Sequence, residues 1–344
     1  KGAPASKKRY LPGAANEITE ERGADMKKNV LVLLPVEARH KEKLEAAGAG
    51  CCFVYSDPDT VTEEQIRAAN IILGLPKADM LKASGNLEWL QLASAGTDPY
   101  IVPGVLHPKT VLTNATGAYS KAVAEHAFAL TLMLTKKLHL YRDEQRSRRW
   151  SDHGAVSSLS DSTVAVVGLG DIGRAYARLV KAMGAYVIGV KRRGGNCPEY
   201  VDELVLTQDL DSVLPRADVV MSILPNTAAT RYIYTDKSFD SMKDSAVFIN
   251  CGRGNAVSAE VLYRALSAHK IAAAGVDVTE EEPLPADSPL WGLENLVITP
   301  HISGGFHLPE TFERIVDIAA GNLAAFLAGG ELRNVVDFTT GYAR

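Results

Sequence analysis

Three ionisable residues in the second half of the sequence have side-chain types that can bind an anion and transfer a proton. Arg253 stands between two glycines, Glu282 precedes a proline and His301 follows one. A guanidinium can hold a substrate carboxylate and polarise the adjacent ketone. A histidine can deliver a proton near neutral pH, and a paired carboxylate favours its imidazolium form and orients it. Taken singly, such residues more often belong to a surface turn, a solvated loop or a structural contact. Their arrangement therefore decides whether a catalytic role is the better interpretation.

That arrangement is set by predicted strands, because each residue follows the end of one. The segments are Ile249–Gly254, Gly275–Pro283 and Thr299–Gly305. In an open parallel sheet the carboxyl ends of the strands face the ligand crevice. We therefore expect the three residues to converge beside one crevice as a catalytic set.

A glycine-rich loop upstream indicates what else binds in that crevice. The predicted strand Thr163–Val167 runs into Gly168-Leu169-Gly170-Asp171-Ile172-Gly173, which opens a helix expected to end at Met183. The first glycine permits a tight turn, the second lets the backbone approach a pyrophosphate, and the third allows close helix–strand packing. The helix N-terminus then directs its amides and dipole at the phosphates. The context on both sides favours dinucleotide binding over a strand–turn–helix without a ligand.

The next predicted strand, Tyr186–Val190, is followed by cations. An NAD site places a carboxylate about 20 residues beyond the loop, where it accepts hydrogen bonds from the adenosine ribose. Lys191, Arg192 and Arg193 stand there instead, Lys191 being 18 residues beyond Gly173. Cations suit a 2′-phosphate, which predicts NADP as the cofactor, with NAD still possible. The alternative is an exposed basic turn that does not contact the cofactor.

Short apolar runs rich in β-branched residues alternate with helical stretches along most of the chain. Runs of this kind, separated by helices, indicate parallel strands that are covered on both faces. The predicted fold class is α/β, with two doubly wound parallel-sheet domains. The other expected strands are Val30–Leu34, Cys52–Tyr55, Ile71–Gly74, Trp89–Ala93 and Val111–Thr113 before the glycine loop, and Val219–Leu224, Ala246–Asn250, Ala274–Val278 and Val297–Thr299 after it.

The stretch from Ser120 to Tyr141 is expected to form one long helix that is apolar around much of its circumference. Such a helix is buried on more than one side, either between domains or in a subunit interface. It falls where the first group of strands ends, so a domain boundary is placed near it. Residues 1–25 are polar and without a pattern, and are interpreted as a tag, linker or disordered extension.

The composition argues against several functional classes. The 344 residues are 46% hydrophobic and 23% charged with a net charge of −4, which favours neither a nucleic-acid nor a membrane partner. The longest apolar run, Ala122–Leu134, is too short to span a bilayer and contains a glutamate and a histidine. The 4 cysteines lack metal-ligand spacing and fit a reduced, cytoplasmic setting. We expect a cytoplasmic protein without a metal.

Taken together, four segments resemble the signatures of the D-isomer-specific 2-hydroxyacid dehydrogenase family: Gly168–Gly173, Asn250–Gly254, Asp277–Pro283 and Thr299–Gly304. The resemblance runs from Met26 to the C-terminus and is closest to the glyoxylate/hydroxypyruvate reductase-like branch. It implies hydride transfer between NADP(H) and a small 2-keto or D-2-hydroxy acid. It also implies a flavodoxin-like substrate domain, a Rossmann cofactor domain and a homodimer.

The resemblance assigns roles to individual residues. It implies that Arg253, Glu282 and His301 are catalytic, and that the amides of Ala95 and Gly96 hold the substrate carboxylate, with Arg253 and His301 also contacting the substrate. The expected cofactor contacts are Gly168, Gly170, Asp171, Ile172, Gly173, Lys191, Arg192, Arg193, Leu224, Pro225, Cys251, Gly252, Arg253, Asp277, His301, Ser303 and Gly304.

The family topology also revises the domain boundaries. The substrate domain becomes discontinuous, 26–124 and 305–344, around a cofactor domain at 125–304. The helix Phe312–Leu327 crosses back to the substrate domain, and the helix from Ser120 is expected to support the homodimer interface.

Alternatives remain open at this point. An NAD-linked D-lactate-type or phosphoglycerate-type dehydrogenase is one, although the family's NAD-dependent members carry an acidic residue where Lys191 stands. A dinucleotide-sensing, corepressor-like binding protein is another. Glu282 argues against a formate dehydrogenase, in which glutamine replaces this carboxylate. Trp291 either walls the substrate pocket or is a packing residue.

Overall fold

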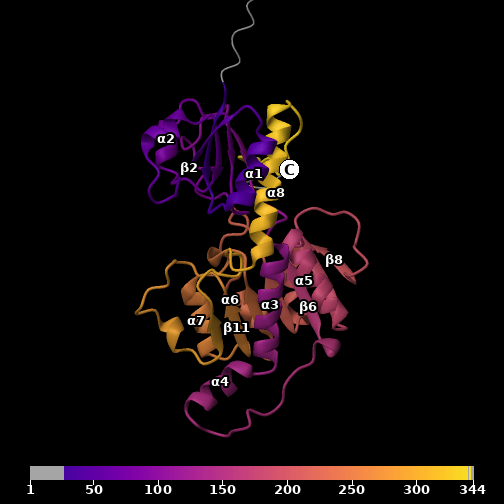
Figure 1. Cartoon of the computed structure of the whole chain (residues 1–344). Helices are drawn as coiled ribbons and strands as arrows, with labels where there is room; N and C mark the ends of the chain where they lie inside the picture. Colours follow the sequence, from indigo (N-terminus) through magenta and orange to yellow (C-terminus); the bar gives the residue numbers. More distant parts are fainter. Residues whose placement is uncertain (1–26, 340, 342–344) are drawn as a thin grey trace, which may run out of the picture.

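Two all-parallel sheets organise residues 27–339 and 341, the part of the chain that this computed structural model describes (Figure 1). The first sheet consists of β1 (Asn29–Leu33), β2 (Cys52–Tyr55), β3 (Ile71–Gly74), β4 (Trp89–Gln91) and β5 (Val111–Thr113). The second consists of β6 (Thr163–Val167), β7 (Tyr186–Lys191), β8 (Glu203–Leu206), β9 (Val219–Ser222), β10 (Val247–Asn250), β11 (Ala273–Val276) and β12 (Leu296–Ile298).

The strand orders confirm the predicted fold class. The first sheet has the order β2-β1-β3-β4-β5, which is the flavodoxin-like 2-1-3-4-5 arrangement. The second reads β8-β7-β6-β9-β10-β11-β12, the Rossmann order 3-2-1-4-5-6 with one further strand. The strand order of the second sheet reverses between β6 and β9, and a ligand crevice is expected at this switch point.

Helices cover both sheets because the central strands are apolar on both faces; in β1, β3 and β6 nearly every residue is buried. Every predicted strand is present, with ends displaced by at most 2 residues. The sequence did not predict β8, a half-buried edge strand that pairs with β7 alone. The helices are α1 (Ala38–Ala47), α2 (Glu63–Ala68), α3 (Ser120–Thr135), α4 (Leu138–Arg146), α5 (Asp171–Ala182), α6 (Asp236–Ser241), α7 (Ala259–Ser267) and α8 (Pro309–Leu327).

The prediction of one helix from Ser120 to Tyr141 is wrong, because the helix breaks between α3 and α4. Lys137 lies in the left-handed region at φ 56°, and its ammonium group donates to the carbonyl of His153. Neither glycine nor proline marks this break in the sequence. Helix α3 packs against α5, β10 and β11 and buries Val123, Leu130 and Leu134, while Phe128, Leu132 and Met133 are only partly buried. No residue of α4 is buried.

Helix α8 returns the chain to the first sheet, and Figure 1 shows it beside α1. Phe326 stacks on Trp89 with ring centroids 5.3 Å apart, and the Asn322 amide donates to Gln91 at 2.8 Å. The following segment makes an antiparallel bridge from Val335 to Thr113. The interpretation of residues 1–25 as an extension lies outside the described residues.

Candidate active site

The glycine loop has the geometry that a bound pyrophosphate needs. Gly168 has a φ of +105°, and a Cβ there would lie 2.7 Å from the Ile223 carbonyl oxygen. A Cβ on Gly173 would lie 2.1 Å from the Gly168 oxygen, so α5 can approach β6 only with glycine at this position. Gly170, the N-cap of α5, has open space where its Cβ would be. The exposed amides of the first helical turn therefore face a space that can accept an anion.

A cleft of about 250 Å³ adjoins this loop and is lined by both halves of the molecule. A Cβ on Gly252 would lie 2.6 Å from the Leu224 amide nitrogen, so the ends of β9 and β10 are tightly apposed there. The lining includes Gly168, which follows β6, and Leu224, which follows β9, so the cleft lies at the switch point between these two strands. Its lining includes these predicted site residues: Ala95, Gly96, Gly168, Gly170, Asp171, Ile172, Gly173, Leu224, Pro225, Cys251, Gly252 and Arg253.

Arg253 reaches from the end of β10 to a loop of the first sheet. Its Nε donates to Asp98 Oδ2 at 3.1 Å, and Nη1 donates to the Gly252 carbonyl at 2.8 Å. A Cβ on Gly96 would lie 1.9 Å from Nη2, so a larger residue at this position would displace the guanidinium from where it stands. The Arg253 side chain keeps 30% of its exposure. Arg253 bonds to Asp98 through Nε, and these contacts place Nη2 beside the backbone of the loop.

Glu282 and His301 come together at the ends of β11 and β12. His301 Nδ1 lies 2.7 Å from Glu282 Oε2, while Glu282 Oε1 accepts from the Thr279 amide at 3.0 Å. An ionised carboxylate can only accept, so Nδ1 is the donor and Nε2 is left for a ligand. Both side chains are partly exposed. The pair has the geometry of a histidine oriented by a carboxylate, and its catalytic role stays a prediction.

The turn that carries His301 is held by a buried carboxylate, Asp277. Its oxygens accept hydrogen bonds from the Thr299 hydroxyl at 2.5 Å and from the backbone amides of Ile302 and Ser303 at 3.0 and 3.1 Å. The Ser303 hydroxyl adds another at 2.5 Å. His301 itself has a φ of +52°, a conformation that a non-glycine residue keeps only when its surroundings hold it. Asp277, expected from the sequence to contact the cofactor, therefore also fixes the turn at His301.

His126 on α3 is a residue of this network that the sequence reasoning missed. Its Nε2 lies 3.0 Å from Thr299 Oγ1 and 3.7 Å from Asp277 Oδ1. The Thr299 hydroxyl proton points to Asp277, so His126 Nε2 is the donor to Thr299. A single histidine within an apolar helix carries no signal for such a contact, because the partner is 173 residues away.

Several predicted residues lie beside the cleft or away from it. Lys191 ends β7, and its Nζ lies 3.2 Å from the position of a Cβ on Gly195. Arg192 and Arg193 are exposed. Trp291 is 55% exposed and donates from its indole to the Pro285 carbonyl at 2.9 Å. None of these residues lines the cleft, nor do Glu282, Asp277, His301, Ser303 and Gly304.

The chemistry of the site does not involve a thiolate. Cys251 is 7% exposed, and burial together with the nearby Asp277 charge raises the pKa of its thiol far above the usual range. The thiol is therefore neutral at physiological pH.

Among the described residues, no group of His, Cys, Asp and Glu side chains could hold a metal ion. Within the same part of the chain, no helix has the length and apolar character to cross a membrane.

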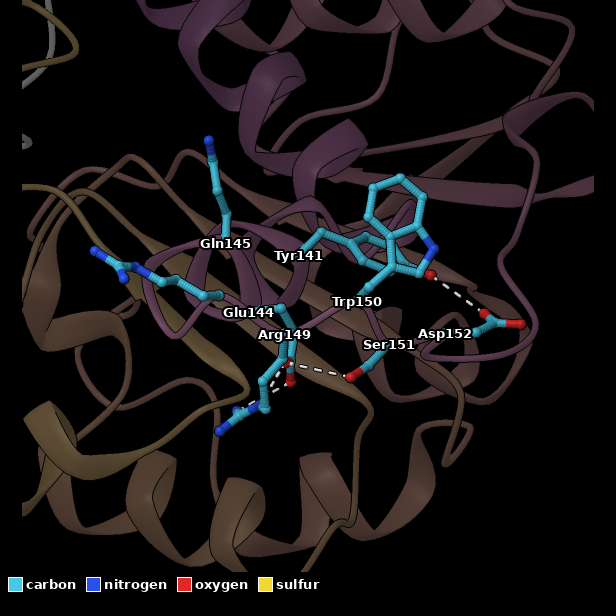
Figure 2. A pocket seen from close by; sticks show the side chains of 8 residues that line it. Tyr141, Glu144, Gln145, Arg149, Trp150, Ser151 and Asp152 are labelled. Carbon is cyan, nitrogen blue, oxygen red and sulfur yellow. Dashed lines mark hydrogen bonds and ion pairs between the residues drawn. The ribbon is translucent and has the colours of Figure 1, made fainter.

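A larger hollow, about 750 Å³, lies on α4 and the segment that follows it (Figure 2). Glu144 accepts a hydrogen bond from Arg149 there at 2.6 Å, and Tyr141 and Trp150 also line the hollow. Neither strand ends nor the glycine loop contribute to this hollow. In an open parallel sheet ligands bind at strand ends, so we assign the site to the smaller cleft.

Known proteins resemble this chain in sequence and in structure. Residues 128–303 match the family model described as D-isomer specific 2-hydroxyacid dehydrogenase, NAD binding domain. The human glyoxylate reductase/hydroxypyruvate reductase is 34% identical over 254 residues, which are 72% of this chain and 76% of that protein.

Solved structures extend the similarity over nearly the whole chain. A D-isomer specific 2-hydroxyacid dehydrogenase family protein from Aeromonas salmonicida is 32% identical with a TM-score of 0.81, covering 91% of this chain and 99% of that one. The NADPH-dependent glyoxylate/hydroxypyruvate reductase from Sinorhizobium meliloti, solved with NADP and sulfate, is 26% identical with a TM-score of 0.77. It covers 92% of this chain and 100% of that one.

Proposed function

The chain belongs to the D-isomer specific 2-hydroxyacid dehydrogenase family of NAD(P)-dependent oxidoreductases, and from that premise we propose that it reduces small 2-keto acids with NADPH. The substrates we infer are of the glyoxylate and hydroxypyruvate type. The observation that carries the proposal is the cleft that joins the glycine loop to Arg253, with the Glu282–His301 pair on neighbouring strand ends. The names of the similar human and Sinorhizobium meliloti enzymes support the same substrates.

Each residue has a distinct task in this reaction. The nicotinamide supplies the hydride for the keto carbon when it is bound. Arg253 holds the substrate carboxylate through its Nη2 edge and polarises the keto oxygen. His301 gives the Nε2 proton to the developing alkoxide, and Glu282 stabilises the positive charge of the imidazolium before transfer. The amides of Ala95 and Gly96 complete the contact with the carboxylate.

A substrate screen tests this function directly. Purified protein is mixed with glyoxylate, hydroxypyruvate or pyruvate, each with NADPH and with NADH, and the loss of reduced nicotinamide is followed by absorbance. We expect turnover of the first two acids, with a higher kcat/KM when NADPH is the donor. No turnover with any pair would contradict the proposed function and would favour a binding role.

The cofactor preference is proposed to come from Lys191, Arg192 and Arg193, at the end of β7. Replacing both arginines with alanine should raise the KM for NADPH about 10- to 100-fold, because charge-assisted hydrogen bonds to the 2′-phosphate are lost. The KM for NADH should change little. The control removes two exposed cations elsewhere, Arg67→Ala with Lys77→Ala. An unchanged KM for NADPH would show that the basic turn is not the phosphate site.

We propose the division of the chain into a substrate domain, 26–124 with 305–344, and a cofactor domain, 125–304. The packing of α8 on α1 and on the first sheet supports it.

We also propose a homodimer. Helix α3 buries part of its apolar surface inside the chain, and we propose that the interface is made by the exposed segment of α4 and Trp150 that follows it.

Trp150 provides the test of that interface, because its side chain is fully exposed at 104% relative accessibility. An exposed tryptophan commonly anchors a contact between two proteins. Trp150→Ala should weaken self-association at least about tenfold, as measured by light scattering on a dilution series. Trp291→Ala, which removes a tryptophan that is 55% exposed, is the matched control. A monomeric wild type would refute the homodimer, and an unaffected variant would refute this interface.

A further inference from the structure

His126 on helix α3 is a polar side chain that joins this helix to the turn carrying His301. Its Nε2 lies 3.0 Å from Thr299 Oγ1 and 3.7 Å from Asp277 Oδ1, and its side chain keeps 22% of its exposure. The Thr299 hydroxyl has one proton, which Asp277 accepts at 2.5 Å, so the Thr299 oxygen can only accept from His126. The contact is therefore directional: His126 donates to Thr299, and Thr299 donates to Asp277.

Thr299 and Asp277 are also the two residues that hold the backbone of His301. The His301 amide is shared between the carbonyl oxygens of Asp277 at 2.7 Å and Thr299 at 3.0 Å. The Asp277 carboxylate, which has no solvent exposure, also accepts from the amides of the next two residues at 3.0 and 3.1 Å. The hydroxyl that His126 contacts thus belongs to a residue that fixes the position of His301.

Helix α3 is a firm support for this contact because it packs directly against β11. A Cβ on Gly275 in β11 would lie 3.3 Å from Leu130 Cβ. Beyond His301, a Cβ on Gly304 would lie 3.2 Å from Tyr119 Cδ1, at the start of the helix. A side chain at either glycine would press on α3. The helix is therefore closely seated on both sides of His126, which lies between these two contacts along the chain.

The donor on Thr299 strengthens the rest of the network. A hydroxyl whose oxygen accepts a hydrogen bond is polarised, and its own bond to Asp277 becomes stronger. Without His126, the Thr299 side chain is free to rotate, and the buried Asp277 carboxylate then loses one of the donors that compensate its charge. The turn would be held less firmly, although His301 needs its surroundings to keep a φ of +52°.

We propose that His126 is a positioning residue for the reduction of the 2-keto acid. It holds Thr299 against Asp277 and thereby keeps the His301 imidazole aligned with Glu282 and with the substrate. This inference rests on the proposed function. His126 acts through two other residues and is not itself the proton donor to the substrate.

Two replacements of His126 separate the hydrogen bond from the bulk of the side chain. The amide nitrogen of glutamine reaches the place of Nε2, whereas that of asparagine reaches only the place of Nδ1. His126→Asn should lower kcat for glyoxylate about 10- to 100-fold, while His126→Gln should stay within about threefold of the wild type. The KM for glyoxylate should change less than kcat, because Arg253 is not moved. An equal kcat in all three proteins, or an equal loss in both variants, would overturn the proposal.

The other end of the same bond provides a second test, which also covers the case in which a His126 variant does not fold. Thr299→Val keeps the shape and removes the hydroxyl, so kcat should fall at least as far as in His126→Asn. The double variant should be within about twofold of Thr299→Val, because both changes break one chain of bonds. Thr135→Val is the control, since it removes a hydroxyl that donates within α3, to the Thr131 carbonyl. Losses that multiply in the double variant would overturn the proposal.

A measurement without turnover distinguishes this inference from the proposed function. NMR of protein labelled with ¹⁵N in the histidine rings reports on its 8 imidazoles, and His301→Asn identifies the signals of His301. Because Nδ1 of His301 lies 2.7 Å from Glu282, these signals should shift in His126→Asn and stay in place in His126→Gln. Unchanged His301 signals in His126→Asn would overturn the proposal. If the wild type reduces no 2-keto acid, the proposed function fails, and the NMR result still decides whether His126 positions His301.

Discussion

His301→Asn should lower kcat by about 10²- to 10⁴-fold while the Kd for NADPH changes little, because the variant loses the proton donor and leaves the glycine loop unchanged. Asparagine is the informative replacement, since His301 has a φ of +52° and asparagine tolerates that left-handed conformation. The turn should therefore survive and its amides still bind Asp277. Cofactor affinity is measured by nicotinamide fluorescence and kcat with glyoxylate.

Two comparisons separate proton donation from a structural effect. Glu282→Gln keeps a hydrogen-bond acceptor for Nδ1 and removes the charge, so kcat should fall less than in His301→Asn. His107→Asn, an exposed histidine outside the cleft, should leave kcat unchanged. Near wild-type turnover of His301→Asn would sink the assignment of His301 as the proton donor.

The sequence predicted the architecture well for a definite physical reason. Strands buried on both faces are short and uniformly apolar, and the residues that the ligand needs follow the carboxyl ends of the strands. The glycine loop could be predicted because each glycine meets a separate steric requirement. Gly168 has a positive φ, and Gly173 leaves no room for a Cβ. The edge strand β8 was not readable, since a half-buried strand of 4 residues has no such pattern.

The break between α3 and α4 shows where local patterns end. Lys137 adopts a left-handed conformation that its own side chain does not prefer, and contacts of Lys136 and Lys137 with the carbonyls of Ser157 and His153 accompany it. Those carbonyls lie 16 to 21 residues further on. Helical periodicity continues through the break, so only the fold of the later segment reveals it.

The site was predictable by residue type but not by contact. Motifs nominated Arg253, Glu282 and His301, yet nothing in their spacing pairs Arg253 with Asp98, 155 residues earlier. The same holds for His126, which reaches Thr299 across the second sheet. Contacts between distant segments depend on how α3 and the loops pack, and a pattern read along one chain does not contain that information.

Arg253→Lys should lower kcat/KM for glyoxylate about 10²- to 10³-fold, even though the positive charge is kept. The guanidinium makes simultaneous bonds to Asp98 and to the Gly252 carbonyl while presenting Nη2 toward the Gly96 backbone. A lysine ammonium is a point charge that cannot satisfy these directions together. Paired with Asp98, it would turn away from the substrate carboxylate, so the KM for glyoxylate should rise as kcat falls.

The design of this experiment isolates the planar fork from the charge. Arg253→Ala should be more severe than Arg253→Lys, and guanidinium ions added to the alanine variant should restore part of its turnover, whereas ammonium ions should not. The Kd for NADPH should stay within about threefold in both variants, because the glycine loop does not depend on the guanidinium. A lysine variant within threefold of the wild type would contradict the argument, since it would mean that charge alone suffices. If guanidinium ions restore turnover of the Arg253→Ala variant and ammonium ions do not, the rate depends on the planar shape of the cation that Asp98 and Gly252 hold in place.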